Sequence, residues 1–267
     1  FVKAMLAKRG LWEKIKEAGF QLLNVPRSLM ASVDLSAPLR QGVFFVGRPK
    51  QFVPAFLKMF KMFGSEKAFK TAMQDISARP TFELMRDTKL ALTDMDAMLT
   101  SREEQFMSNW AEKIPVLGRL VRASGRAYTG FLNKLRADVF DDLVRKAENS
   151  GLKPQINRDL TKEISHFINA ATGRGSLGGL ERSAKVLNSL FFSPRLMASR
   201  LTLLNPVYYM RATPFVRKEA LKSLFTFAST GLTILGLAKL GGADVVTDAR
   251  SADFGKIKIG NTRLDIW

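Results

Sequence analysis

Three glycines of this chain have the spacing of a dinucleotide-binding loop, Gly173-Arg-Gly-Ser-Leu-Gly178. In such a loop the glycines let the backbone approach a pyrophosphate, which binds the amides at the start of the next helix. The pattern has this meaning only directly after a strand, and the preceding segment, Asp159 to Asn169, has the spacing of a helix instead. We therefore predict that residues 171–179 form a linker between helices, in which Arg174 could still contact a phosphate.

Side chains capable of acid–base or metal chemistry do not form a catalytic pattern. The single histidine, His166, has no partner at metal-ligand spacing. The pairs Glu103-Glu104 and Asp141-Asp142 are adjacent, and adjacent residues on a helix point about 100° apart, so neither pair flanks one substrate atom. With no cysteine there is no disulfide, thiolate metal site or cysteine nucleophile. We expect no catalytic residue, no metal and no cofactor, and we interpret the chain as non-enzymatic.

The cationic side chains predict contact with polyanions. The chain has 42 Lys and Arg against 24 Asp and Glu, a formal net charge of +18, which attracts nucleic acid and anionic lipid headgroups alike. Between Ala184 and Lys222 seven basic residues accompany one acid, Glu219. For any single Lys or Arg, a solvated helix face is an equally good interpretation. The residues predicted to contact a polyanion are Arg195, Arg200, Arg211, Arg217, Lys218 and Lys222, with Lys58 and Lys61 behind them.

Directly after these cations the chain has sixteen residues without charge, Ser223 to Ala238. A membrane span needs about 20 apolar residues, and this run includes five Ser or Thr and two Gly, which partly cancel the gain from insertion. Two interpretations stay open. We favour a core helix of a soluble bundle, and the alternative is a helix over residues 223–240 that inserts into a membrane. In the second case Arg217, Lys218 and Lys222 would keep its N-terminal side in the cytoplasm.

The elements that position these groups are helices, and the longest begins at Ile114-Pro115 and ends at Asn149-Ser-Gly151. A continuous helix there is about 50 Å long and needs partners along its length, which predicts an elongated helical bundle. Apolar residues recur on it in steps of three, four or seven, and charged residues fill most of the other face. The apolar set is Leu117, Leu120, Val121, Tyr128, Phe131, Leu135, Val139, Leu143 and Ala147, and the charged set is Arg119, Arg122, Arg126, Lys134, Arg136, Asp141, Asp142, Arg145 and Lys146.

Shorter helices are predicted before the long one. They lie over Leu11–Leu23, from Pro26, from Pro38, over Pro54–Phe63 and over Glu66–Ile76. The fourth has an apolar face with lysines beside it, which suits either a membrane surface or a bundle. We favour the bundle because neighbouring segments offer matching apolar faces. That face comprises Phe56, Met59, Phe60 and Phe63, flanked by Lys58 and Lys61.

The C-terminal end predicts one more helix and a hairpin. A helix over Thr213–Leu240 is closed by Gly241-Gly242, and Lys256–Ile266 alternates polar and apolar residues around a Gly-Asn pair, as a β-hairpin does. The predicted fold is mainly α: an elongated bundle with long amphipathic helices and a small C-terminal β-hairpin. We divide it into an N-terminal helical segment, the long helix, short helices with the glycine-rich linker, the apolar helix and the hairpin region, over residues 1–112, 113–151, 152–212, 213–243 and 244–267.

Several motifs together resemble a region of very large proteins of tailed bacteriophages and prophages, grouped with the large polyvalent proteins. The motifs are Asn169-Ala-Ala-Thr-Gly-Arg-Gly-Ser-Leu-Gly178, Leu187-Asn-Ser-Leu-Phe-Phe-Ser-Pro-Arg-Leu-Met-Ala-Ser-Arg200, Leu204-Asn-Pro, Val216-Arg-Lys-Glu-Ala-Leu221 and Asp253-Phe-Gly-Lys-Ile-Lys-Ile-Gly-Asn-Thr-Arg263. The resemblance covers mainly residues 155–267, with a weaker likeness over Asn24–Gly42. No chemistry is attached to these motifs, so the resemblance brings no catalytic residue.

The resemblance implies a module of a multi-domain phage protein that is packaged in the virion or delivered with the genome. The chain starts without Met and stops within a predicted strand, so we expect a piece of a longer polypeptide. Expected partners are other regions of that polypeptide, DNA bound without sequence preference, an anionic membrane and further copies of the chain. Expected locations are the virion or the host cytoplasm, with association with the inner membrane. The predicted function is a structural or delivery module that contacts polyanions, and the alternative is an ejection component that inserts residues 223–240 into a membrane.

Overall fold

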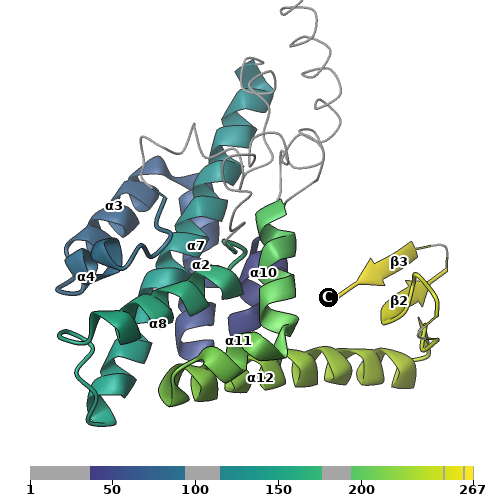
Figure 1. The fold of residues 1–267 in the computed structure, drawn as a ribbon. Coiled ribbons are helices and arrows are strands. Elements are labelled where there is room, and N and C mark those ends of the chain that lie inside the picture. Colours follow the sequence, from purple (N-terminus) through teal and green to yellow (C-terminus); the bar gives the residue numbers. More distant parts are fainter. Residues whose placement is uncertain (1–36, 94–114, 176–193, 249, 261, 267) are drawn as a thin grey trace, which may run out of the picture.

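The fold is mainly helical, with a small antiparallel sheet near its C-terminal end (Figure 1). This computed structural model describes residues 37–93, 115–175, 194–248, 250–260 and 262–266. The predicted fold class is confirmed. The helices predicted over Leu11–Leu23 and from Pro26 lie outside the described residues, as does most of the glycine-rich linker.

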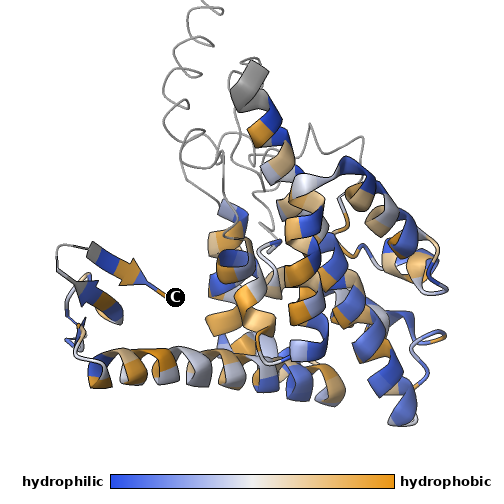
Figure 2. Ribbon diagram, turned by 180° about the vertical axis from the view of Figure 1, so that it is seen from behind, coloured by the Kyte–Doolittle hydropathy of each residue, from blue (hydrophilic) through white to orange (hydrophobic). Residues whose placement is uncertain are grey.

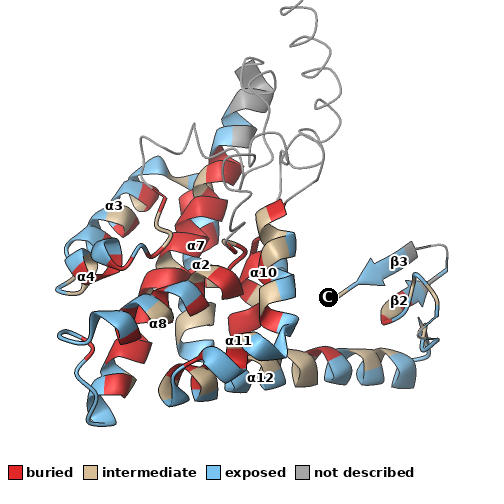
Figure 3. Ribbon diagram, viewed as in Figure 1, coloured by how far each residue is buried: buried red, intermediate tan, exposed pale blue. Residues whose placement is uncertain are grey.

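The central element is α7, Pro115–Asn149, which has the bounds that its proline start and glycine end predict. Three helices pack against it, namely α2 (Pro49–Gly64), α3 (Glu66–Ser77) and α8 (Arg158–Ala171). From Tyr128 onward the predicted apolar face is buried, whereas Leu120 is exposed (Figure 3). The predicted charged face is partly wrong: Arg136 and Asp142 are buried too, because helices cover α7 on more than one side.

Helix α2 begins five residues before the predicted start at Pro54. Pro49 occupies its first turn, and Pro54 lies inside the helix. Met59 is buried and Phe60 of the predicted face is half exposed. Because α2 packs along α7, the interpretation of this segment as part of a bundle is confirmed.

Side-chain caps fix the starts of the neighbouring helices. Ser65 caps α3 by accepting a hydrogen bond from the backbone N–H of Ala68 at 3.2 Å. Asn157 caps α8 in the same way, from the N–H of Leu160 at 3.1 Å. Both helices agree with their predicted ranges. A further short helix, α4 (Phe82–Asp87), was not predicted.

Phenylalanines join the N-terminal part of the described chain to α8 and to the C-terminal helices. The helix start predicted at Pro38 is a π-helical turn, η1 (Pro38–Gly42), followed by a 3₁₀ turn, η2 (Val43–Phe45). The rings of Phe45 and Phe167 are 5.7 Å apart and nearly perpendicular, and those of Phe44 and Phe227 are 5.8 Å apart. Such ring pairs add to the stability that burial already provides.

Three helices that each begin at a proline form the next part of the chain. They are α10 (Pro194–Leu204), α11 (Pro206–Arg211) and α12 (Pro214–Leu240), and the last has its predicted bounds. The first half of α12 packs on the bundle, where Val216 and Ala220 are buried. Its second half extends away from the other helices toward the sheet, with apolar residues along it (Figures 1 and 2). The favoured interpretation of α12 as a core helix is therefore wrong for that half.

The sheet contains the predicted hairpin and one additional strand. Strands β2 (Lys256–Ile259) and β3 (Thr262–Asp265) pair antiparallel, with Lys256 opposite Asp265. The turn uses Gly260, whose φ of 59° is in the left-handed region that glycine favours. Strand β1 (Asp244–Val245) pairs with β2 on its other edge and was not predicted.

A close approach of η1 to α7 makes Gly42 a sensitive position. A Cβ atom there would lie 2.6 Å from the Cζ of Phe131, a fully buried ring. We expect Gly42→Ala to lower the free energy of unfolding by about 1–3 kcal/mol through overpacking, as measured by urea denaturation. Gly64→Ala is the control, since a Cβ at Gly64 meets nothing within 4 Å. Equal effects of the two substitutions would contradict this packing.

Candidate anion-binding site

The predicted polyanion contacts are spread over four helices. They are Arg195 and Arg200 on α10, Arg211 on α11, Arg217, Lys218 and Lys222 on α12, and Lys58 and Lys61 on α2. Three of them line separate hollows. Arg200 lines an apolar hollow between α10 and α12. Arg211 lines a shallow hollow beside His166. Lys222 lines a cleft between α7 and α12. The last of these hollows brings Lys222 together with cations that the sequence did not single out.

Arg217 holds two helices together. Its Nε donates to the carbonyl oxygen of Tyr209 at 2.8 Å, and its Nη2 donates to two more carbonyls at 3.0 and 2.9 Å. These carbonyls lie at the end of α11, where a helix leaves its last acceptors without partners. Lys58 forms an exposed ion pair with Asp75 at 3.8 Å, which contributes little to stability.

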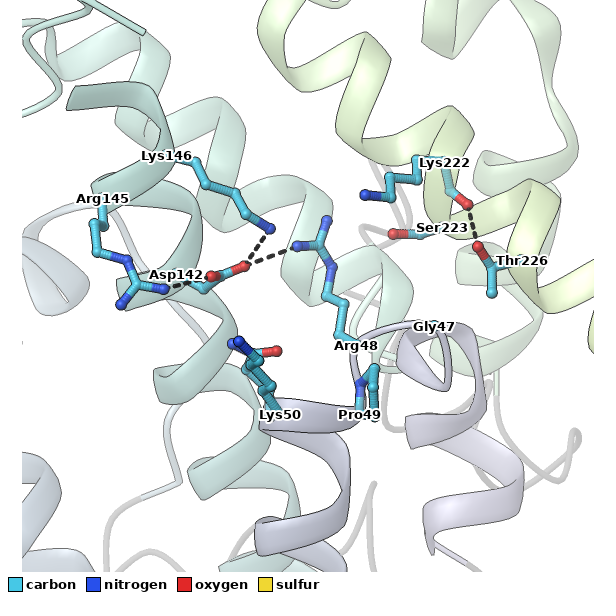
Figure 4. A pocket seen from close by; sticks show the side chains of 11 residues that line it. Gly47, Arg48, Pro49, Lys50, Asp142, Arg145, Lys146, Lys222, Ser223 and Thr226 are labelled. Carbon is cyan, nitrogen blue, oxygen red and sulfur yellow. Dashed lines mark hydrogen bonds and ion pairs between the residues drawn. The ribbon is translucent and has the colours of Figure 1, made fainter. Parts of the chain in front are cut away.

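The cleft lies where the start of α2, the end of α7 and the middle of α12 meet (Figure 4). Its volume is about 310 Å³. One edge of the cleft is formed where the turn before α2 packs closely on α12. The close approach is evident at Gly47, where an added Cβ would lie 2.5 Å from the methyl group of Thr226. Five basic side chains line the cleft: Arg48, Lys50, Arg145, Lys146 and Lys222.

Arg48 joins α7 to α12 through two buried ion pairs. Its Nη1 donates to Asp142 Oδ2 at 3.0 Å and its Nη2 to Glu219 Oε2 at 2.7 Å. The three side chains are 7%, 6% and 11% exposed. Buried charges of this kind require partners, since removing one leaves the other without compensation for its lost hydration.

Asp142 accepts two more hydrogen bonds from its own helix. Arg145 Nη2 donates to its Oδ1 at 2.9 Å and Lys146 Nζ to its Oδ2 at 2.7 Å. Burial of the carboxyl group opposes its ionisation, but Lys146, the charge of Arg48 and the hydrogen bond from Arg145 outweigh this and lower the pKa of Asp142. The carboxylate is therefore ionised and saturated with donors at neutral pH.

Two cations of the cleft form no ion pair with any residue that the structure describes. Among the described residues, Lys50 and Lys222 have no carboxylate within 4.0 Å. The Nε of Arg48 is buried and has no acceptor in the described part of the chain. The cleft is lined by five cations and one carboxylate, Asp142, and Glu219 pairs with Arg48, so the local excess is three positive charges.

A second candidate surface is the outer half of α12. Among the described residues, α12 alone is long and apolar enough to cross a membrane, and only 17% of its most apolar window is buried. Phe225, Leu232 and Leu240 are 74%, 64% and 86% exposed. An apolar surface of this kind on a soluble protein marks contact with another protein or a membrane.

Side chains able to ligate a metal are not clustered in the described part of the chain, where no group of three or more His, Cys, Asp or Glu is placed to do so. His166 is exposed, with its ring centroid 6.1 Å from that of Tyr208. Burial raises the pKa of Tyr209 to about 12. We derive no reaction from these residues.

Sequence reasoning missed the centre of the cleft. Arg48 is separated from Asp142 by 94 residues and from Glu219 by 171. No local pattern links residues that far apart. The one local signal is the adjacent pair Asp141-Asp142, whose side chains point too far apart to flank one substrate atom and which therefore did not indicate a site.

Comparisons of the chain with protein-family models, with curated proteins and with solved structures found no match.

The ion pair between Arg48 and Asp142 makes the stability of the folded chain depend on pH, and this dependence can be tested. We expect Asp142→Asn to lower the free energy of unfolding at pH 7 by roughly 2 kcal/mol, the value of a hydrogen bond to a charged group. Because the pKa of Asp142 is lowered in the folded chain, its contribution is complete above the unfolded pKa of about 4 and is lost as the pH falls through the folded pKa. Denaturant titrations from pH 7 to pH 3 should therefore show the two proteins converging.

The matched control is Asp87→Asn, which removes an exposed ion pair with Arg158, 3.0 Å long. It should change the stability by less than about 1 kcal/mol at any pH. A stability difference for Asp142→Asn that does not depend on pH would contradict the role assigned to this carboxylate.

Proposed function

We propose that this chain is a non-enzymatic module of a large phage protein and that it docks on an anionic membrane through α12. The exposed apolar surface of α12 supports the membrane part of the proposal. The resemblance of residues 155–267 to large polyvalent proteins supports the phage context. Of the two polyanions considered from the sequence, lipid fits this surface better than DNA.

One face of α12 combines apolar and cationic side chains. Lys218, Phe225, Leu232 and Lys239 follow one another at intervals of seven residues, and all four are exposed. Residues at that interval drift by only about 20° around a helix, so they form one line with a lysine at each end. A lysine stem can lie along an apolar surface while its ammonium group reaches lipid phosphates.

The exposed part of α12 is suited to lie in the membrane interface. The last residue of α12 that packs against the main core is Phe227, so residues 228–240 extend beyond it. At the standard helical rise these 13 residues span about 20 Å, which is less than the roughly 30 Å of a bilayer core. A helix that keeps its first half on the bundle therefore contacts the lipid surface without crossing it.

DNA is the weaker candidate for the same physical reason. Protein–DNA interfaces are polar and strongly charged, and phosphates provide no partner for Phe225, Leu232 and Leu240. Anionic lipid provides partners for both the lysines and the apolar side chains. The single observation that carries the proposal is this pairing of the two residue types on one exposed face.

Vesicle flotation tests the proposal. The chain should float with vesicles that contain phosphatidylglycerol, and Phe225→Ser/Leu232→Ser should weaken binding at least about tenfold, since each large apolar side chain contributes roughly 1.5–3 kcal/mol on burial. Added salt should weaken binding as well, because exposed charges are screened. Ile156→Ser is the control, since Ile156 is 77% exposed but lies in the loop before α8.

Three outcomes would overturn the proposal. One is flotation of the double variant as efficient as that of the unchanged protein. Another is equal flotation with neutral phosphatidylcholine vesicles, which would assign no role to the lysines. The third is salt-sensitive binding to duplex DNA without flotation, which would make DNA, and not lipid, the polyanion that the chain contacts.

A further inference from the structure

We propose that the cleft between α2, α7 and α12 binds a phosphate group, carried either by a small soluble molecule or by a lipid headgroup. The inference rests on the charges and the shape of the cleft and does not depend on membrane docking by α12. It concerns a different set of side chains from the line of residues that ends at Lys239.

The charge balance of the cleft leaves room for an anion. The two carboxylates, Asp142 and Glu219, both bind Arg48, and Lys146 lies 2.7 Å from the first and 3.9 Å from the second. With the acids already occupied, Lys50 and Lys222 have no carboxylate of their own among the described residues. Five cations less two anions leave three positive charges at one concave surface, where like charges repel and an anion relieves the repulsion.

The cations converge from different directions. Lys146 on α7 and Lys222 on α12 extend toward Arg48 from opposite walls of the cleft (Figure 4). Lys50 stands on the third wall, in the first turn of α2, a helix of 16 residues. That turn adds the partial positive charge of a helix N-terminus, which the Arg48 side chain does not cap.

The ligand that fits this arrangement is compact and tetrahedral. Ammonium groups on opposite walls can each reach a different oxygen of one phosphate, whereas the two oxygens of a carboxylate point to one side. The volume of about 310 Å³ is at the lower end of small-molecule sites, about 300–1,000 Å³. It admits a phosphate with a small substituent and is too small for a length of duplex DNA.

The direct test uses inorganic phosphate as the probe, titrated by calorimetry at constant ionic strength with chloride as the balancing ion. We expect saturable binding, weakened at least about tenfold by Lys50→Gln/Lys222→Gln, since each substitution removes a charge-assisted hydrogen bond to the phosphate. The matched control is Lys67→Gln/Lys153→Gln, which removes the same charge from exposed lysines outside the cleft. It should weaken binding less than about twofold. All four lysines are exposed, so both variants are expected to fold.

A second arm identifies the source of the phosphate. Vesicles with phosphatidic acid, a phosphate monoester, are compared with vesicles of equal charge that contain phosphatidylserine. A preference for phosphatidic acid that is lost in the cleft variant but kept in the control variant would support a lipid headgroup. Phosphate binding in solution without that preference would support a soluble phosphate compound.

The proposal is overturned if phosphate does not bind saturably, or if the cleft and control variants weaken binding equally, which would show general charge attraction. Because the calorimetric arm contains no lipid, a failure of membrane docking leaves its outcome unchanged. Flotation without phosphate binding would likewise overturn the proposed phosphate site, and it would leave the membrane role of α12 unaffected.

Discussion

The buried guanidinium of Arg48 is the constraint on which the arrangement of the helices depends. A charge that is 7% exposed must be compensated by opposite charges, and here they come from two helices, Asp142 of α7 and Glu219 of α12. Arg48 also lies directly before Pro49, which starts α2. One side chain therefore fixes the start of α2, the end of α7 and the first half of α12 relative to one another. The aromatic contacts of Phe44 and Phe45 support the same junction with apolar packing.

This junction divides α12 into two parts with different surroundings. Up to about Phe227 the helix is held by the ion pairs, by Val216 and Ala220 in the core and by the phenylalanine rings. Beyond that residue the helix extends away from the other described helices toward the small sheet (Figure 1). The apolar residues that follow are as hydrophobic as those of a core helix but have few neighbours. The function we propose depends on this difference, since the packed half anchors the module, while the outer half and the exposed side chains of Lys218 and Phe225 remain available to lipid.

Local features of the sequence were sufficient to predict the bounds of α3, α7, α8, α12 and the hairpin, but not the start of α2 or the presence of α4 and β1. Proline at Pro115 and Pro214, glycine after Asn149 and the Gly-Asn pair of the hairpin act within a few residues of the boundaries they set. The burial of Asp142 and of Arg136 could not be predicted in this way. It depends on helices that cover a side of α7 other than its apolar face, and no local pattern on α7 indicates those helices. The outer half of α12 was misjudged for the opposite reason: its composition resembles a core helix, but composition does not reveal where the neighbouring helices end. The predicted cations were positions on single helices, and the cleft arises only where three helices meet.

The molecule thus combines a rigid, charge-paired junction with an exposed apolar helix that has lysines along it. Since the chain has no cysteine, a single Leu232→Cys substitution allows a polarity-sensitive fluorescent label to be placed on the outer face of α12. We predict that this label reports water in the free protein and lipid once vesicles with phosphatidylglycerol are added, while a label at Ile156→Cys reports water throughout. A label at position 232 that is already shielded in the free protein, or that still reports water when vesicles are present, would contradict the central claim that this half of α12 is an open, lipid-binding surface.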